Sequence, residues 1–531
     1  MRANARTLLF GLALVGASCR CGEPGGQRAY DVGVPLGDLP AASGALAASV
    51  PGPVLAYAEA QDGRELAQAV TGSAWFSALQ KSGGLQSLAL SGPAATLTAL
   101  VQRLNDLSRS PIGGEALVDL LDGPLAVAIR THERGGFDLL LLKTVGPKSA
   151  GALRLAQMLE AVHPSASEVG IERHRGLPVR ALRLDGIHKL HYVVLRDRLL
   201  VSTDPTWLRR ALDLSLGRGP TQVQPSVAQV QQAAASSRGF ALIDGRAALA
   251  SPSLGTAGRA LAGLSWLALR WNAEGAELGA RRAAGSFGGS GPRLAFPPGT
   301  ALGLAREAKL EELLVLPEAP VGGAADGGAA VDEAARALLG TVSRTLDPTL
   351  EGHVLYALGP APGGSASHLL ALSTGRARAA SSAFEALVPR LFRAPAMRHE
   401  DLGTGVRCVG TAPALCWAEL GPLLTLATWP GALHAEAEAL RAPHAQAFGP
   451  LSLFVDPAQL AQLLGRAGLP GARRKAGGLG ELEPLAAALR ASRPLLAQLQ
   501  TAPNPTEAWG AVAEVPRPPE PRRESRDGGG P

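Results

Sequence analysis

Apolar residues in the middle of the chain follow two spacings: the alternation typical of strands and the three-to-four-residue period typical of helices. Strands are predicted at residues 125–130, 138–144, 178–184, 190–195 and 198–202. The last two enclose only Arg196 and Asp197, which predicts a tight hairpin. The run of four leucines from Leu139 is apolar on both faces, so we expect that strand to lie centrally in its sheet.

Helices are predicted at residues 63–79, 93–107, 149–162 and 205–214. The last begins at Pro205, directly after Asp204, and an aspartate there accepts hydrogen bonds from the free N–H groups of the first turn. Asp244 and Asp456 also follow a strand and precede a helix, so all three are interpreted as helix caps and not as catalytic groups. The order of elements predicts an α+β fold, with helices mainly on one face of a largely antiparallel sheet.

The same elements recur further along the chain in the same order. Residues 190–205, LHYVVLRDRLLVSTDP, align without a gap with residues 415–430, LCWAELGPLLTLATWP. Further matches join 176–180 with 403–407, 123–129 with 352–358, 137–142 with 367–372, 50–51 with 296–297, and 239–250 with 450–464. A series of elements repeated in order indicates a duplicated unit. We expect tandem copies at residues 46–290 and 291–510.

The first nineteen residues carry an export signal. Arg2 and Arg6 precede an apolar run at residues 8–17, which is too short for a membrane span of roughly 20 residues. Small residues then lead into Cys19 and resemble the lipobox of bacterial lipoproteins. We therefore expect residues 1–18 to be a signal peptide and Cys19 to carry lipid. Because Arg20 follows it rather than Asp, we expect the periplasmic side of the outer membrane.

The remaining segments are connections. Residues 19–45 are rich in Gly, Pro and Ala and are interpreted as a tether between lipid and domain. Residues 511–531 are rich in Pro, Arg, Glu and Gly and are interpreted as a disordered tail. No further stretch is apolar enough to predict a membrane span.

Charge is unevenly distributed. The formal net charge of the 531-residue chain is +6, and residues 130–218 hold fifteen Arg or Lys against nine Asp or Glu. A solvated face explains such a stretch, but the matching part of copy two is neutral. The alternative is a surface for an anionic envelope polymer or lipid head group, since clustered positive charge attracts such partners. Its candidate contacts are Arg173, Arg175, Arg180, Arg183, Lys189 and Arg198. Nucleic acid is not expected as a partner behind an export signal.

Cys408 and Cys416 are the strongest chemical signal after the leader. They flank a bend at residues 411–413, and a hairpin centred there places the two side chains opposite each other. An exported protein meets an oxidising compartment, in which a disulfide persists. Copy one has Ala181 and His191 at the matching positions, so both cysteines are absent there together. A disulfide is predicted.

No catalytic motif is present: the sequence contains neither a Gly-x-Ser-x-Gly elbow, nor His-Glu-x-x-His, nor a phosphate-binding loop. No cofactor and no metal site are predicted. The favoured interpretation is a non-enzymatic scaffold or binding module held at the membrane through Cys19. The alternative is a periplasmic hydrolase with a site between the two copies, where ligand sites are common.

Three segments resemble a loosely defined group of secreted bacterial lipoproteins with a duplicated α+β unit. These are residues 296–302 (FPPGTAL), 174–179 (HRGLPV) and 199–212 (LLVSTDPTWLRRAL). The resemblance covers most of residues 46–460 and implies an exported, duplicated α+β protein. Its motifs are packing motifs, and it supplies no catalytic residues to carry over.

Overall fold

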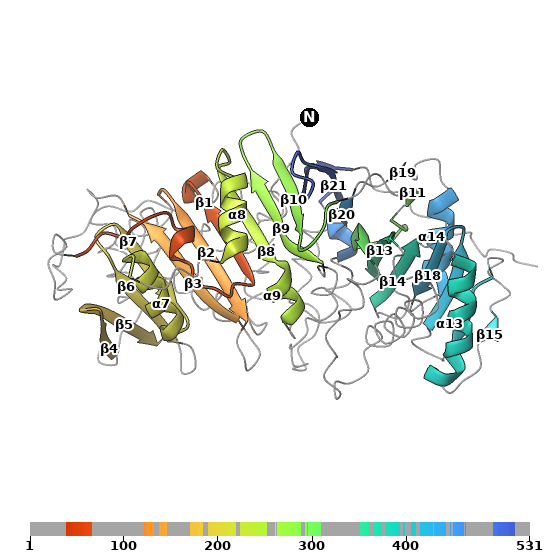
Figure 1. The fold of residues 1–531 in the computed structure, drawn as a ribbon, viewed down its shortest axis with the longest axis horizontal. Coiled ribbons are helices and arrows are strands. Elements are labelled where there is room, and N and C mark those ends of the chain that lie inside the picture. Colours follow the sequence, from red (N-terminus) through yellow and green to blue (C-terminus); the bar gives the residue numbers. More distant parts are fainter. Residues whose placement is uncertain are drawn as a thin grey trace, which may run out of the picture. The chain divides into compact units, whose positions relative to one another are not determined.

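The structure is a computed structural model. It describes residues 39–65, 122–131, 137–145, 170–183, 189–218, 224–251, 261, 263–287, 293–294, 296–309, 351–360, 366–373, 377–392, 397–398, 405–409, 415–427, 430–441, 446–447, 450–460, 462 and 492–515. The chain divides into two compact units, whose described parts lie within residues 39–285 and 286–515. Both consist mainly of antiparallel sheet with separate helices, which fits the α+β class (Figure 1).

The first unit contains one antiparallel sheet of ten described strands. They are β1 (Ala56–Ala60), β2 (Leu125–Thr131), β3 (Phe137–Thr144), β4 (Gly170–His174), β5 (Leu177–Arg183), β6 (Lys189–Val194), β7 (Arg198–Ser202), β8 (Gly239–Asp244), β9 (Leu264–Trp271) and β10 (Ala276–Arg282). Across the sheet the order is β4-β5-β6-β7-β3-β2-β1-β8-β9-β10. The five strands predicted between 125 and 202 are confirmed to within a residue or two at their ends.

The predicted central position of the leucine run is confirmed. β3 lies between β2 and β7, and successive leucines point to opposite faces of the sheet. Leu140 and Leu142 on one face are fully buried, and Leu141 on the other is 8% exposed. Both faces of the sheet are therefore covered at β3.

In the described part of the chain, three helices with both ends described and a short 3-10 turn accompany the first sheet. They are η4 (Ala47–Ser49), α7 (Pro205–Ser215), α8 (Pro225–Ala233) and α9 (Gly245–Ala250). The helix α7 lies on β6 and β7, while α8 and α9 contact β8 and β9. Asp204 and Asp244 are the N-caps of α7 and α9, because each carboxylate accepts a hydrogen bond from a first-turn N–H. The predicted capping role of both residues is confirmed.

The second unit also contains an antiparallel sheet of ten described strands. They are β12 (Leu302–Lys309), β13 (Glu351–Pro360), β14 (Ala366–Ser373), β15 (Met397–Arg398), β16 (Arg407–Val409), β17 (Leu415–Leu420), β18 (Leu423–Ala427), β20 (Leu451–Val455), β21 (Leu495–Thr501) and β22 (Glu507–Glu514). Their order is β15-β16-β17-β18-β14-β13-β12-β20-β21-β22. Strand for strand in chain order, this is the order of the first unit. A separate pair joins β11 (Arg293–Leu294) to β19 (Gln446–Ala447).

The helices α13 (Ala377–Phe392) and α14 (Pro430–Arg441) lie on opposite faces of the second sheet. Phe384 of α13 packs edge-on against Trp417 at 5.1 Å between ring centroids. Leu433 of α14 belongs instead to the core cluster that contains Cys416, whose side chain points to the other face of β17. The expectation of helices mainly on one face is therefore wrong for this unit, because its sheet buries apolar side chains on both sides.

Two predicted boundaries also need correction. The strand β22 runs to Glu514, so the tail predicted from residue 511 begins inside a strand. The tether predicted to end at residue 45 includes residues that pack on the first unit, since Leu39 is only 2% exposed. The helices predicted at 93–107 and 149–162, and nearly all of 63–79, lie outside the described residues.

Candidate functional site

A segment that we call the strap, residues 39–54, lies against the first unit just before β1. Leu46 is 3% exposed, and Val50 and Val54 are fully buried. Backbone and side-chain hydrogen bonds fix the strap at several points. The backbone N–H of Ala42 donates to Asp197 at 2.7 Å, and the N–H of Ser43 donates to the Ser215 carbonyl at 2.6 Å.

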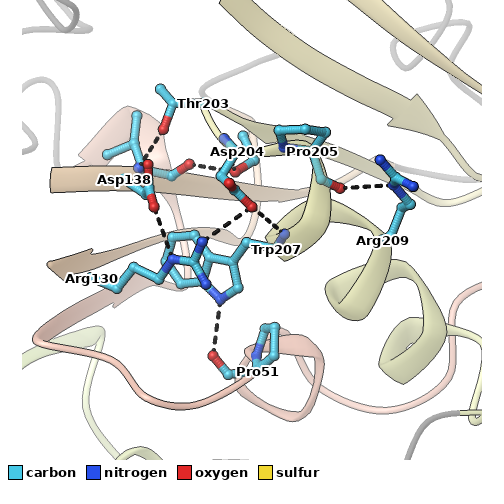
Figure 2. A network of polar contacts seen from close by, with 10 residues as sticks. Pro51, Arg130, Asp138, Thr203, Asp204, Pro205, Trp207 and Arg209 are labelled. Atoms are coloured by element: carbon cyan, nitrogen blue, oxygen red, sulfur yellow. Dashed lines mark hydrogen bonds and ion pairs between the residues drawn. The ribbon is translucent and has the colours of Figure 1, made fainter. Parts of the chain in front are cut away.

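Figure 2 shows a polar network beneath the start of α7. The Arg130 guanidinium lies between two carboxylates, with Nε 3.0 Å from Asp138 and Nη2 3.1 Å from Asp204. Its Cζ also lies 4.9 Å from the ring centroid of Trp207, a cation–π distance. Asp204 therefore serves twice, because it also accepts the Trp207 backbone N–H at 2.5 Å as the helix cap.

The network reaches the strap through Trp207. This indole is fully buried and donates from Nε1 to the carbonyl oxygen of Pro51 at 3.0 Å. On the other side, Thr203 accepts the N–H of Leu139 through its hydroxyl at 2.9 Å. One half-buried arginine and one buried indole thus connect β2, β3, α7 and the strap (Figure 2). The arrangement positions elements, and sequence reasoning recognised only the Asp204 cap within it.

A second polar group lies under the same helix-covered face of the sheet. Tyr57, 1% exposed, donates from its hydroxyl to Glu59 at 2.6 Å. Burial raises the pKa of both side chains, although the hydrogen bond from Tyr57 and the charge of Arg198 act in the opposite sense on Glu59. Arg198 is 4% exposed and donates to the Ser49 hydroxyl at 2.5 Å and the Gly44 carbonyl at 2.8 Å, both in the strap.

The hairpin of β4 and β5 is held to α7 by ion pairs. Asp213 of α7 accepts from His174 Nε2 at 3.0 Å and from Arg175 Nε at 2.9 Å. Partial burial raises the pKa of Asp213, but these two hydrogen bonds outweigh it and hold the pKa below its ordinary value. Arg209 of α7 adds a 3.4 Å contact to Glu172.

The six basic residues predicted to form one anionic-partner surface do not do so. Arg180 and Arg198 are 8% and 4% exposed, so neither can offer its charge to a partner in solution. Strand alternation also separates the set, because Arg173 and Arg180 lie on one face of the sheet and Lys189 lies on the other.

Three of the six remain accessible. Arg173 and Lys189 are exposed, and Arg175 is exposed but already paired with Asp213. The side chain of Arg183 lies outside the described residues. Charge counting along the sequence could not predict this outcome, since it does not tell which face of a strand is buried.

The predicted disulfide is confirmed. Cys408 on β16 lies directly opposite Cys416 on β17, and their sulfur atoms are bonded. Both residues are buried in the core cluster of the second unit. In the first unit the directly opposed pair at the matching strands is Ala181 and His191, as the sequence alignment predicted.

Glu436 is a buried carboxyl that sequence reasoning missed. It lies on α14 three residues after Leu433, is fully buried, and neither carboxylate oxygen has a hydrogen-bond partner. Burial raises its pKa to about 8. Ala211 stands at the same distance from Pro205 in α7 as Glu436 from Pro430 in α14. A helical projection of α14 could have found this carboxyl beside an apolar stripe.

No described helix is long and apolar enough to cross a membrane. No group of three or more His, Cys, Asp or Glu in the described ranges is arranged to hold a metal ion.

Cys19 and Cys21 lie outside the described residues, so the lipidation of Cys19 stays a prediction. Comparison with protein-family models, with curated proteins and with solved structures finds no match to this chain.

Proposed function

We propose that this protein is exported, carries lipid on Cys19, and acts at the periplasmic side of the outer membrane as a non-enzymatic binding module. The Cys408–Cys416 disulfide is the observation that carries the proposal, because such a bond persists in an oxidising compartment. The leader ending at Cys19 supports it independently. The charged groups under α7 have structural roles: Asp204 caps the helix and Arg198 donates hydrogen bonds to the strap. Such roles suit a scaffold.

We propose further that the module consists of two tandem copies of one fold. The support is the common strand order of the two ten-stranded sheets. Strand pairing also supports it: Arg180 opposes Tyr192 in the first unit, and Arg407 opposes Trp417 in the second. Within this proposal the second copy has lost the polar group of the first, since Gly303 and Ala305 occupy the register positions of Tyr57 and Glu59.

Membrane fractionation of the Cys19→Ser variant tests the anchoring. We expect the wild-type protein in the membrane pellet after a salt wash and the variant in the soluble fraction. Cys21→Ser is the matched control, because it removes a neighbouring thiol and should leave the protein in the pellet. A Cys19→Ser variant that still pellets would contradict the lipid anchor. Density-gradient separation of the two membranes then checks the outer-membrane assignment.

The hydrolase with a site between the two copies stays the alternative prediction. It would replace the binding module if the purified full chain hydrolysed a chromogenic ester or peptide substrate at a rate that the heat-denatured protein lacks.

A further inference from the structure

Among the residues that the structure describes, β4 is an edge strand of the first sheet. Within the described residues it pairs only with β5, and Figure 1 shows it at the border of that sheet. An open edge presents backbone N–H and C=O groups without strand partners, and such edges pair readily with another extended segment.

The hairpin geometry tells which backbone groups point outward. The loop of β4 and β5 consists of Arg175 and Gly176, which have φ of 53° and 83°. Two residues with positive φ make a type I′ turn, in which the flanking residues His174 and Leu177 are a hydrogen-bonded pair. Pairs alternate along an antiparallel ladder, so Arg173 opposite Pro178 is a non-hydrogen-bonded pair, which suits a proline without N–H.

The same alternation makes Ile171 opposite Arg180 a non-hydrogen-bonded pair. The backbone groups of Ile171 and Arg173 therefore point away from β5, toward the open edge. Their side chains lie together on one face, because they are two residues apart in a strand. Glu172 and His174, between and after them, point to the other face and contact α7.

Two exposed side chains share one face of this edge, one apolar and one basic, while the exposed Glu172 lies on the other face. Ile171 is 58% exposed, the largest exposed fraction of any large apolar side chain in the described part of the chain. Arg173 beside it is also exposed. The only other large apolar side chain described as exposed is Ile243, at 37%, and it lies on β8, which is paired on both sides.

We propose that the β4 edge binds an extended segment of a partner protein by antiparallel strand addition, with an acidic residue opposite Arg173 and an apolar residue opposite Ile171. Because the added strand runs antiparallel to β4, the partner reads acidic-x-apolar from its N-terminus. Charge complementarity at Arg173 and apolar contact at Ile171 give the selectivity, and the outward backbone groups of both residues give the strand pairing. This proposal rests on the binding role proposed above and names the chemistry of its partner.

A peptide-binding assay tests the proposal on the purified full chain in solution, and it does not depend on the membrane anchor. The probe is the fluorescent peptide Ser-Thr-Glu-Thr-Ile-Thr-Ser, followed by anisotropy at low salt. We expect Arg173→Glu to weaken binding about five- to tenfold, because an attraction becomes a repulsion at a surface pair. The peptide with Lys in place of Glu should bind that variant as the original binds the wild type.

An N-methylated peptide and a set of control variants distinguish strand addition from non-specific electrostatic or hydrophobic binding. The same peptide N-methylated at its Glu and Ile lacks the N–H groups that would face β4, and we expect no binding. Ile171→Ala should weaken binding, whereas Ile243→Ala and Arg246→Glu, at exposed positions away from β4, should not. Equal binding of the N-methylated peptide, or equal losses in the control variants, would overturn the proposal.

Other occupants of the edge are separate outcomes. Absence of peptide binding together with Arg173-dependent binding to anionic phosphatidylglycerol vesicles would overturn the proposal in favour of a lipid surface. Absence of peptide binding with Ile171-dependent dimers in analytical ultracentrifugation would overturn it in favour of a second copy of this chain. Either result would leave the anchoring through Cys19 untouched, since fractionation tests that separately.

Discussion

The helices α7 and α14 carry different buried residues at the same distance from their starts. Glu436 places an unpartnered carboxyl under α14, where α7 has the fully buried Ala211. Burying an ionised carboxylate without a hydrogen bond is costly, so burial raises the pKa of Glu436 to about 8. The folded protein therefore keeps this carboxyl protonated below that pH. The unfolded chain releases the same proton near its ordinary pKa. A single Glu within the apolar stripe of α14 thus makes the stability of the folded protein depend on pH.

We predict that the stability of the second unit falls as pH rises from about 5 to about 8. In this window the folded state holds a proton that the unfolded state has lost, so ionisation favours unfolding, and above about pH 8 this contribution levels off. Glu436→Gln should flatten the dependence and raise the free energy of unfolding at pH 8 by an amount on the order of a few kcal/mol. Urea denaturation at pH 5, 7 and 9 measures it. Glu438→Gln on the exposed face of α14 is the control, and an equal effect there would contradict the prediction.

The residues that sequence reasoning placed correctly are those with a local signature. The cap Asp204 precedes a proline, and the two cysteines flank a bend, so neighbours in sequence determine their roles. Arg198 was misplaced among the surface cations because its partners, Ser49 and Gly44, lie about 150 residues earlier. A long-range burial of this kind leaves no trace in the local pattern of charge.

At the scale of elements, α7 makes polar contacts with three separate parts of the first unit. Its N-terminus binds Arg130 through Asp204, its first turn donates from Trp207 to the strap, and its last turn holds the β4–β5 hairpin through Asp213. Each contact joins a segment far away in the sequence. Together with the ladder between β4 and β5, α7 therefore helps to hold the β4 edge in place.

We predict that Asp204→Ala lowers the free energy of unfolding of the first unit by about 1 to 2 kcal/mol, the usual cost of losing an N-cap. Asp204→Asn keeps a cap acceptor for the Trp207 N–H but loses the charge facing Arg130, so its loss should be smaller. Thermal denaturation of both variants checks the order. Asp456→Ala removes a cap in the second unit and should shift that unit's transition instead. A larger loss for Asp204→Asn than for Asp204→Ala would refute this reading of the network.

The bounds of the five strands predicted between 125 and 202 and of the helix predicted at 205–214 were predictable to a residue or two, but one register was not. The sequence alignment sets Phe137 on Ser367, whereas the strand pairing sets Asp138 at the position of Ser367. Strands β3 and β14 are apolar on both faces over most of their length, so a shift by one residue leaves the hydrophobic pattern almost unchanged. The opposite placement of α13 and α14 was missed for the same reason, because neither face of such a sheet is marked as polar.

At the scale of the whole molecule, the strap connects the N-terminal region to the first unit. Leu46 and Val50 are buried, and the strap supplies the hydrogen-bond acceptors of Arg198 and Trp207. Removing it would expose apolar surface and leave a buried guanidinium without partners, which is among the costlier losses a fold can suffer. The strap is therefore part of the first unit and not a spacer.

We predict that deletion of residues 20–50 lowers the free energy of unfolding of the first unit by roughly 5 kcal/mol or more, because it removes the polar partners of Arg198 and four buried apolar side chains, Leu39, Leu46, Ala47 and Val50. Deletion of residues 20–38, which ends before the strap, is the matched control and should leave thermal stability unchanged. Two deletions with the same melting temperature would show that the strap contributes nothing.

The docking of Leu39 has a consequence for where the protein can act. If lipid holds Cys19 in a membrane, twenty peptide units connect Cys19 to Leu39, the first residue that the structure describes. A fully extended chain gains at most about 3.6 Å per residue, so the segment from Cys19 to Leu39 spans no more than about 70 Å. Any partner strand that meets the β4 edge must come to within this working radius of the membrane surface, plus the breadth of the unit itself.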